Sequence, residues 1–298
     1  MAEYEYDQEK VHALLETIIN INSSEKAQLW LQQRLQAWQQ TSAIPHFNQT
    51  FTAIPRFTGK EIITVTTEQQ AALRQTVPGF FVEGWPLDRL TRVWWLLQLI
   101  SVDKTLYIST IENLFNAAEM NELAALYSAL PLLAWPEEWK LRAAEGVRSN
   151  IGVVQEAIML RNPYPACYLD DPAWNQLVMK AIFTEKPLHL IHGLDERANE
   201  ALAATLVDFA HERQAAGRKV SPMQWRLLTR FIDHHNIDDI TRIWNSADQV
   251  EKAAAGLVCA QSAFPPARQL LAQSPAIAAE IQEGSISWDF IAKKIYTT

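Results

Sequence analysis

Apolar residues return every three to four positions along most of this chain, which is the spacing of amphipathic helices. Pro, Ser, Asp and Asn interrupt the spacing where helices would begin or end, as at Ser24, Pro136 and Asp171-Pro172. The pattern predicts helices over residues 7–20, 24–40, 68–76, 87–101, 110–130, 137–148, 151–161, 172–183, 196–216, 246–258, 264–273, 275–282 and 286–295, and one more that begins at Ser221-Pro222. It therefore predicts an all-α fold.

Helices of this length joined by short links favour an irregular stack of antiparallel helix pairs, α-solenoid-like in the manner of HEAT repeats. We expect one all-α domain over residues 1–298, in which residues 1–66 can form a peripheral N-terminal part. Residues 41–67 depart from helical spacing, and "EIITVTT" at 61–67 is the one strand-like run, without an evident partner strand. Whether 41–67 packs as a lid or trails over the surface stays open.

The composition supports helices and a large core. Nine glycines in 298 residues is few for a fold that needs many turns or phosphate loops. The eleven tryptophans are expected mainly in helix packing rather than in a binding groove. The net charge is −8, with acidic and basic residues interspersed, so the chain lacks the basic block of a nucleic-acid-binding surface.

Compartment and redox chemistry follow from two further features. Cys167 and Cys259 suggest neither a disulfide framework nor a zinc set. The acidic, polar start lacks the apolar run of a signal peptide, and the apolar stretch 93–100 is far below the ~20 residues of a membrane span. We expect a soluble, cytoplasmic protein.

The common catalytic motifs are missing, since GxGxxG, a Walker P-loop, GxSxG and HExxH do not occur. Asp170-Asp171 and Asp238-Asp239 lack the further acid of a diphosphate-binding helix face, and Asp171 fits a helix cap better. His189-x-x-His192 lacks a third ligand, and the side chains of His234-His235 would diverge on a helix. The sequence therefore predicts no metal and no cofactor.

One helical turn in "LVDFAHERQAAGRKV" (206–220) gathers Asp208, His211, Glu212 and Arg213. Asp208 can meet His211 three residues on, which would make an acid–imidazole pair suited to proton transfer. The alternative is the solvated face of a helix that begins after the cap Asp195. Structure is favoured over a site, and Asp208 and His211 are the only catalytic candidates.

The predicted helix 172–183 carries apolar residues on nearly every side, but also Asn175, Gln176 and Lys180. Buried polar groups need partners, so these side chains either bond to neighbouring loops or line a polar hollow beside helix 196–216. Both interpretations stay open.

Several motifs in one order carry a family resemblance: "NPYPACYLDDPAWNQLVMKAIF", "LIHGLDERANEALAATLVDFAHERQAAGRKVSPMQWRLL" and "GVRSNIGVVQEAI". With these motifs the chain resembles the EboA family, over a core of residues 80–235. The resemblance implies a bacterial component of metabolite traffic in secondary metabolism, encoded beside a membrane prenyltransferase-like protein and several enzymes. It carries over no catalytic residue. The motif positions are the expected functional surface: Asn150, Asn162, Tyr164, Tyr168, Trp174, Asn175, Lys180, Arg197, Asn199, Asp208, His211, Glu212 and Arg213.

We therefore expect a non-enzymatic accessory protein that binds a small-molecule metabolite or a cluster-encoded enzyme. The groove would lie between 172–183 and 196–216, with Lys180, Arg197 and His211 as polar contacts. Contact with the membrane prenyltransferase-like protein would be peripheral, and nucleic acid is not an expected partner. A helical protein-binding scaffold, or an enzyme that uses Asp208 and His211 on a small apolar metabolite, are the alternatives.

Overall fold

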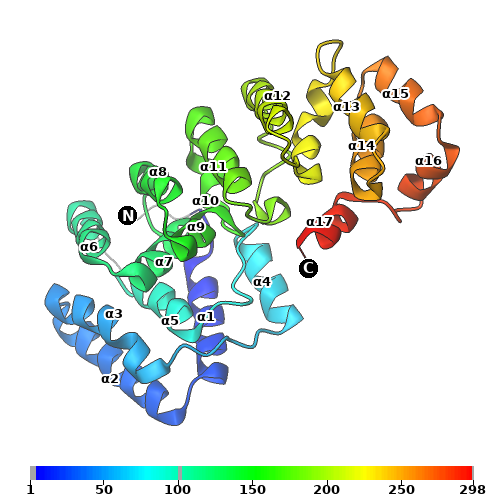
Figure 1. Cartoon of the computed structure of the whole chain (residues 1–298). Coiled ribbons are helices and arrows are strands. Elements are labelled where there is room, and N and C mark those ends of the chain that lie inside the picture. Colours follow the sequence, from blue (N-terminus) through cyan, green and yellow to red (C-terminus); the bar gives the residue numbers. More distant parts are fainter. Residues whose placement is uncertain (1–4, 100–102, 297–298) are drawn as a thin grey trace. The chain divides into compact units, whose positions relative to one another are not determined.

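The computed structural model describes residues 5–99 and 103–296, and it confirms the all-α prediction. The chain divides into two compact units, residues 1–170 and 171–298 (Figure 1). Among the described residues the β-structure consists of one isolated bridge, and none of their helices is long and apolar enough to cross a bilayer. The single domain and the solenoid-like stack stay predictions.

The first unit consists of short helices, several of which begin at a side chain that caps them. Asp7 accepts a hydrogen bond from the Lys10 amide, and Ser24 accepts one from Ala27, because the first turn of a helix leaves its N–H groups unpaired. The helices are α1 Gln8–Asn22, α2 Glu25–Thr41, α3 Ile44–Thr58, α4 Thr67–Thr76, α5 Leu87–Leu96, α6 Lys104–Ala117, α7 Met120–Ala129, η1 Leu130–Leu132, η2 Pro136–Trp139, α8 Lys140–Arg148, α9 Gly152–Met159 and α10 Tyr164–Tyr168.

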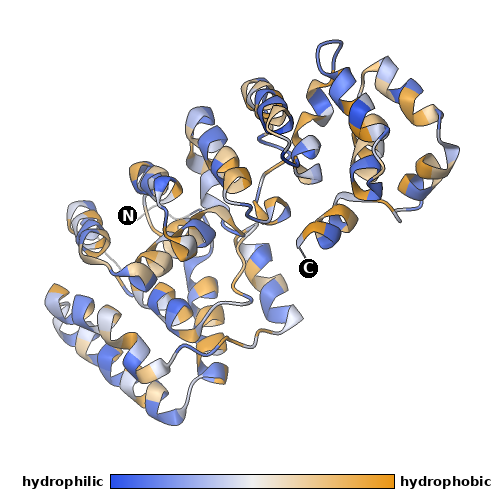
Figure 2. Cartoon of the chain, in the orientation of Figure 1, coloured by the Kyte–Doolittle hydropathy of each residue, from blue (hydrophilic) through white to orange (hydrophobic). Residues whose placement is uncertain are grey.

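Helix α5 is the centre of the first unit, because α1, α3 and α7 all pack against it. Its apolar residues are buried, and the Trp95 indole N–H donates to the Phe47 carbonyl of α3 at 3.0 Å. Figure 2 shows hydrophobic and hydrophilic residues alternating along the ribbons of these helices. Every tryptophan of the chain except Trp85 is buried, which confirms their predicted role in packing.

The stretch 41–67 was predicted to be irregular, and this prediction is wrong over most of its length. Residues 44–58 form the helix α3. Pro45 lies in its first turn, where proline removes no helical hydrogen bond, and the Phe51 carbonyl that Pro55 leaves without a helical donor accepts from the Arg92 Nε instead. Of the strand-like run, only Ile62 pairs, through an isolated antiparallel bridge to Pro86. The predicted helix 110–130 is in fact α6 and α7 with a break after Ala117, and the last two residues of the predicted helix 87–101 lie outside the described residues.

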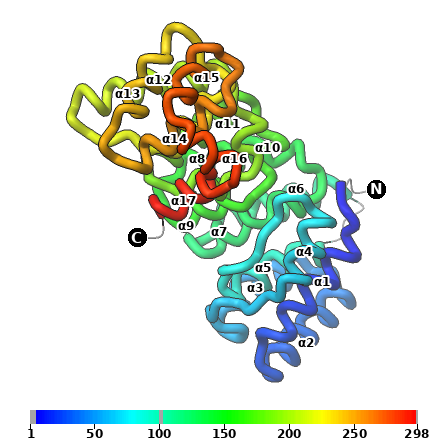
Figure 3. The backbone as a smooth tube through the Cα atoms, turned by 90° about the vertical axis from the view of Figure 1, so that its right-hand side faces the viewer, coloured from blue at the N-terminus to red at the C-terminus, as the bar shows by residue number. Residues whose placement is uncertain are grey.

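The second unit is arranged around α14. It contains α11 Asp171–Phe183, η3 Leu188–Leu190, α12 Glu200–Ala215, η4 Pro222–Phe231, α13 Ile237–Trp244, α14 Gln249–Gln261, α15 Pro265–Ala272, α16 Pro275–Gln282 and α17 Trp288–Tyr296. Helix α14 packs against η4, α13, α15, α16 and α17, and its residues 253–259 are all buried (Figures 1 and 3).

Three details of the second unit differ from the prediction. The long helix predicted from Asp195 begins only at Glu200, because Asn199 is its N-cap and Asp195 instead binds Arg226. The helix predicted after Ser221 is a 3-10 helix. Residues 237–244 form α13, which the apolar spacing had not indicated.

Candidate functional site

A polar cluster joins the start of α11 to the start of α12. The Asn175 and Asn199 amides exchange two hydrogen bonds, with Nδ2 to Oδ1 distances of 3.1 and 2.8 Å. The Arg197 guanidinium binds the Asp171 carboxylate at 2.8 Å and lies 5.1 Å above the ring of Trp174. The structure thus brings together Trp174, Asn175, Arg197 and Asn199 from the predicted site.

The hydrogen bonds of this cluster are directed inward. Besides its bond with Asn175, the Asn199 oxygen accepts from the Leu202 amide and its nitrogen donates to the Arg197 carbonyl. Trp174 is completely buried, so it offers no surface to a ligand. Because an amide has few further bonds to make, this arrangement fixes the two helix starts to each other. Of the two interpretations that the sequence left open for Asn175, the structure shows hydrogen bonding to a neighbouring segment, because its partner Asn199 directly precedes α12.

His211 has a carboxylate partner, but it is not the predicted one. Its Nε2 lies 2.9 Å from Oδ1 of Asp239, which is buried in α13 and also binds Arg242. Asp208 and Glu212 are exposed on α12. From the sequence, Asp239 was a candidate only for diphosphate binding. Its contact with His211 could not be predicted, because it depends on how α13 lies beside α12. Its burial at a helix start was not visible from spacing.

The remaining predicted residues lie in the first unit or near the C-terminal end of α11. Asn162 is buried and its amide links three backbone segments. Its Nδ2 donates to the Tyr127 and Ala157 carbonyls, and its Oδ1 accepts from the Tyr164 amide. The Tyr164 hydroxyl donates to the Pro136 carbonyl at 2.5 Å, and burial raises the pKa of Tyr164.

Burial also raises the pKa of Tyr168. Asn150 is exposed between α8 and α9, and Lys180 is half-buried on α11. Asn162, Tyr164 and Tyr168 belong to the first unit and the residues from Trp174 onward to the second, so the predicted surface is divided between the units.

A cavity of about 430 Å³ lies within the second unit, between the C-terminal ends of α11 and α12, η3, the start of η4, the start of α14 and the end of α17. Its apolar wall consists of Ile182, Leu188, Phe209, Val220, Pro222, Val250, Ile295 and the Tyr296 ring. Its charged residues are Glu185, Lys186, Arg213, Lys219, Asp248, Glu251 and Lys294. A volume of this size suits a small organic molecule.

The charges around the cavity do not all remain available to a ligand. The Asp248 carboxylate caps α14 by accepting from the Val250 amide at 2.8 Å, and Glu251 accepts from the Ser246 hydroxyl at 2.5 Å. The four basic side chains outnumber the three acids, although the whole chain carries −8. The rim is therefore locally favourable to an anionic group.

Arg213 and Tyr296 connect the rim to the apolar wall. The Arg213 Nε donates to the Lys219 carbonyl at 2.6 Å, and the guanidinium lies 5.7 Å from the centre of the Phe209 ring. The Tyr296 hydroxyl accepts from the Leu188 amide, and burial raises the pKa of this phenol. A protonated phenol that accepts one bond can still donate its own proton to a ligand atom.

The sequence pointed to a hollow between these two helices, and the cavity lies at their C-terminal ends. Arg213 is the one predicted site residue among its lining, whereas Asn175, Lys180, Arg197, Asp208 and His211 are not part of it. Much of the wall comes from α14 and α17, whose positions the pattern along α11 and α12 could not indicate.

The family comparison covers most of this structure. The family described as "Metabolite traffic protein EboA" matches residues 11–229. The chain belongs to the EboA family. This EboA match begins well before residue 80, where the sequence placed the start of the family-like core, and it ends within η4. The comparisons with curated proteins and with solved structures found no match.

The matched residues include the α11, η3, α12 and η4 walls of the cavity, with Lys186, Phe209, Arg213 and Lys219 among them. The walls contributed by α14 and α17 lie beyond the match. The EboA name itself assigns a role in metabolite traffic and specifies neither a ligand nor a residue.

Proposed function

We propose that this EboA protein takes part in metabolite traffic by binding a small, largely apolar metabolite with an anionic end, without transforming it. In this proposal it works in the bacterial cytoplasm, within secondary metabolism, and passes the molecule to a cluster-encoded enzyme or to a membrane prenyltransferase-like protein. The observation that carries the proposal is the cavity of about 430 Å³ with an apolar wall and a basic rim.

The apolar wall supports the first half of the proposal. Leu188 and Val220 are buried, and Phe209 and Ile182 are half-buried around the hollow. An apolar ligand body would remove this surface from water, which contributes about 25 cal/mol for each Å² buried. The wall is provided by α11, η3, α12, η4, α14 and α17, so it is built before a ligand arrives and little ordering free energy opposes binding.

The basic rim supports the second half. Lys219 and Lys294 are exposed, while Asp248 and Glu251 already accept hydrogen bonds from their own helix start or from Ser246. An anionic group at the rim could therefore pair with the exposed lysines, while the negative charge of Asp248 and Glu251 is partly compensated by their hydrogen bonds. Lys180, Arg197 and His211, the polar contacts expected from the sequence, are replaced in this role by Lys219 and Arg213.

Two matched fluorescent probes test the proposal. Anilinonaphthalene sulfonate is apolar and anionic, and N-phenyl-1-naphthylamine is apolar and uncharged. We expect the full chain to bind both in a 1:1 complex. Val250→Trp fills the cavity from α14 and should abolish both titrations, whereas Leu141→Trp, at a residue 79% exposed in the first unit, should leave both unchanged.

Lys219→Gln separates the rim from the wall. Since an exposed charge pair contributes about 0.2–1 kcal/mol, the sulfonate affinity should fall by a factor of about 1.4 to 5 while the amine affinity is unchanged. Equal binding by the wild-type protein and Val250→Trp would mean that the probes bind elsewhere, and would refute the proposal. Equal weakening of both probes by Lys219→Gln would remove the anionic half of it.

A further inference from the structure

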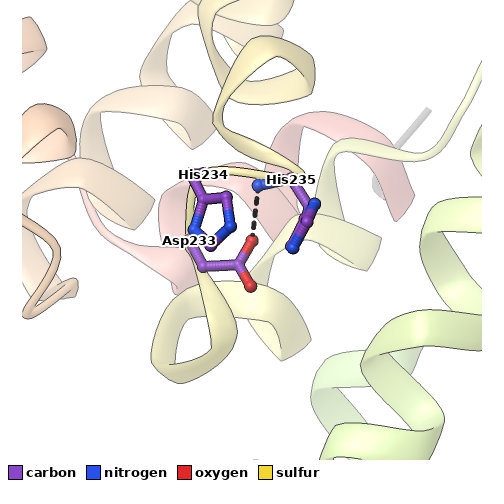
Figure 4. A group of neighbouring side chains, drawn as sticks. All are labelled: Asp233, His234 and His235. Atoms are coloured by element: carbon purple, nitrogen blue, oxygen red, sulfur yellow. Dashed lines mark hydrogen bonds between the residues drawn. The ribbon is translucent and has the colours of Figure 1, made fainter.

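The turn between η4 and α13 gathers three side chains that can ligate a metal: Asp233, His234 and His235 (Figure 4). One potential ligand atom from each lies within 4.8 Å of the others. The side chains of adjacent histidines diverge on a helix, but His234 and His235 precede α13, which begins only at Ile237. In the turn the two imidazole centres are 3.9 Å apart.

Local hydrogen bonds hold this turn in shape. The Asp233 Oδ1 accepts from the His235 amide at 2.8 Å, as the dashed line in Figure 4 marks. Asn236 closes the turn from the other side, since its Oδ1 accepts from the Asp233 amide at 3.0 Å and its Nδ2 donates to the Phe231 carbonyl at 2.9 Å. The carboxylate is therefore oriented through one oxygen, and its other oxygen remains to serve as a ligand.

We propose that Asp233, His234 and His235 bind a divalent transition-metal ion of the zinc type. Two imidazole nitrogens and one carboxylate oxygen form a ligand set that Zn²⁺ and its neighbours prefer over Mg²⁺ or Ca²⁺. Zinc–nitrogen bonds of about 2.0–2.1 Å require the ligand atoms to approach one another more closely than 4.8 Å. Rotation of the two exposed imidazoles supplies this movement.

The bound ion would keep open positions for water, because three protein ligands do not complete its coordination. It would also tie the end of η4 to the start of α13, the helix that carries Asp239, the partner of His211. The three ligands lie beyond residues 11–229 and do not line the cavity. The inference therefore does not rest on the proposed function.

Calorimetric titration of the untagged full chain with ZnCl₂ tests the site. We expect one ion per chain and a loss of at least about tenfold in affinity for each of Asp233→Asn, His234→Gln and His235→Gln, since even residues that only orient ligands are worth 10–100-fold. Asn at position 233 can still accept the His235 amide, so this variant keeps the turn. His46→Gln, which removes an imidazole of α3, is the matched control and should bind as the wild-type protein does.

Visible absorption of the Co²⁺ complex gives a second measurement. It reports on the metal ligands themselves, so substitution of a residue that only supports the fold would not change it. The wild-type protein and His46→Gln should develop d–d bands, and the three turn variants should lose them while keeping the wild-type circular dichroism. Zinc binding that survives in His234→Gln and His235→Gln would place the ion elsewhere. A wild-type protein that takes up neither ion would overturn the inference directly.

Discussion

Replacing Arg92 with methionine should strongly destabilise the first unit. This guanidinium is buried at the centre of α5, where it binds the Asp88 carboxylate at 3.1 Å and lies 3.5 Å from the Glu122 carboxylate of α7. Its Nε donates to the Phe51 carbonyl of α3 at 3.1 Å. Burial lowers the pKa of Arg92, and the carboxylates of Asp88, Glu122 and Glu119 offset this only in part.

The magnitude follows from what the substitution leaves behind. Methionine fills much of the same space but leaves two buried carboxylates without a cation, and breaking a buried charge network in this way costs about 3–5 kcal/mol. The Phe51 carbonyl also loses its donor, which adds about 1–3 kcal/mol if no water reaches it. These contributions overlap, so we expect a total loss of about 3–5 kcal/mol in the free energy of unfolding.

Guanidinium unfolding followed by tryptophan fluorescence and circular dichroism measures this loss as a lower midpoint. The triple variant Asp88→Asn, Arg92→Met, Glu122→Gln removes all three charges and should recover most of the stability, because neutral replacement of a buried network is often tolerated. A single variant within about 1 kcal/mol of wild type would show that the network is solvated. A triple variant as unstable as the single one would show that packing, and not charge, decides the stability.

Three further predictions concern other parts of the fold. Gly146→Ala should lower the unfolding free energy by about 1–2 kcal/mol, because the new Cβ would lie 2.6 Å from the buried Tyr127 ring; thermal unfolding checks this. Asn199→Ala should cost about 1–2 kcal/mol in urea unfolding, and a double-mutant cycle with Asn175→Ala should give a coupling of about 0.5–1 kcal/mol, whereas additive losses would contradict their pairing. Burial raises the pKa of the Cys259 thiol to about 12, so its proton is held more tightly in the folded state. The thermal midpoint should therefore be constant below about pH 8.5, the pKa of an unfolded thiol, and fall as the pH rises further. Cys259→Ala should flatten the first part of that decline.

Local chemistry decided where most helices begin. Ser24 and the Asp171-Pro172 pair mark helix starts in the sequence and in the structure, because a cap or an early proline acts on neighbouring backbone groups alone. The all-α class follows from the repeated spacing of apolar residues, which only helices can bury on one side. The same local reasoning failed at α3, where the spacing of apolar residues departs from the helical pattern. The Phe51 carbonyl that Pro55 leaves without a helical donor is paired by Arg92 of α5, a contact that the sequence of α3 does not contain.

Local signals also fail where two caps compete. Asp195 and Asn199 are both good N-cap residues, and the amide bonds between Asn199 and Asn175 decide in favour of the second. A sequence pattern contains no information on that choice, since the partner belongs to another helix.

The contacts that define the candidate sites arise only in the folded chain. His211 pairs with Asp239 rather than with Asp208, and the cavity needs Val250 and Tyr296 as well as Phe209. A helix determines which residues share its own face, so Asp208 and His211 could be named as neighbours from their spacing. Which carboxylate the imidazole meets, and which helices enclose the hollow, depends on packing between elements far apart in the chain, and that packing is settled by the burial of the whole core.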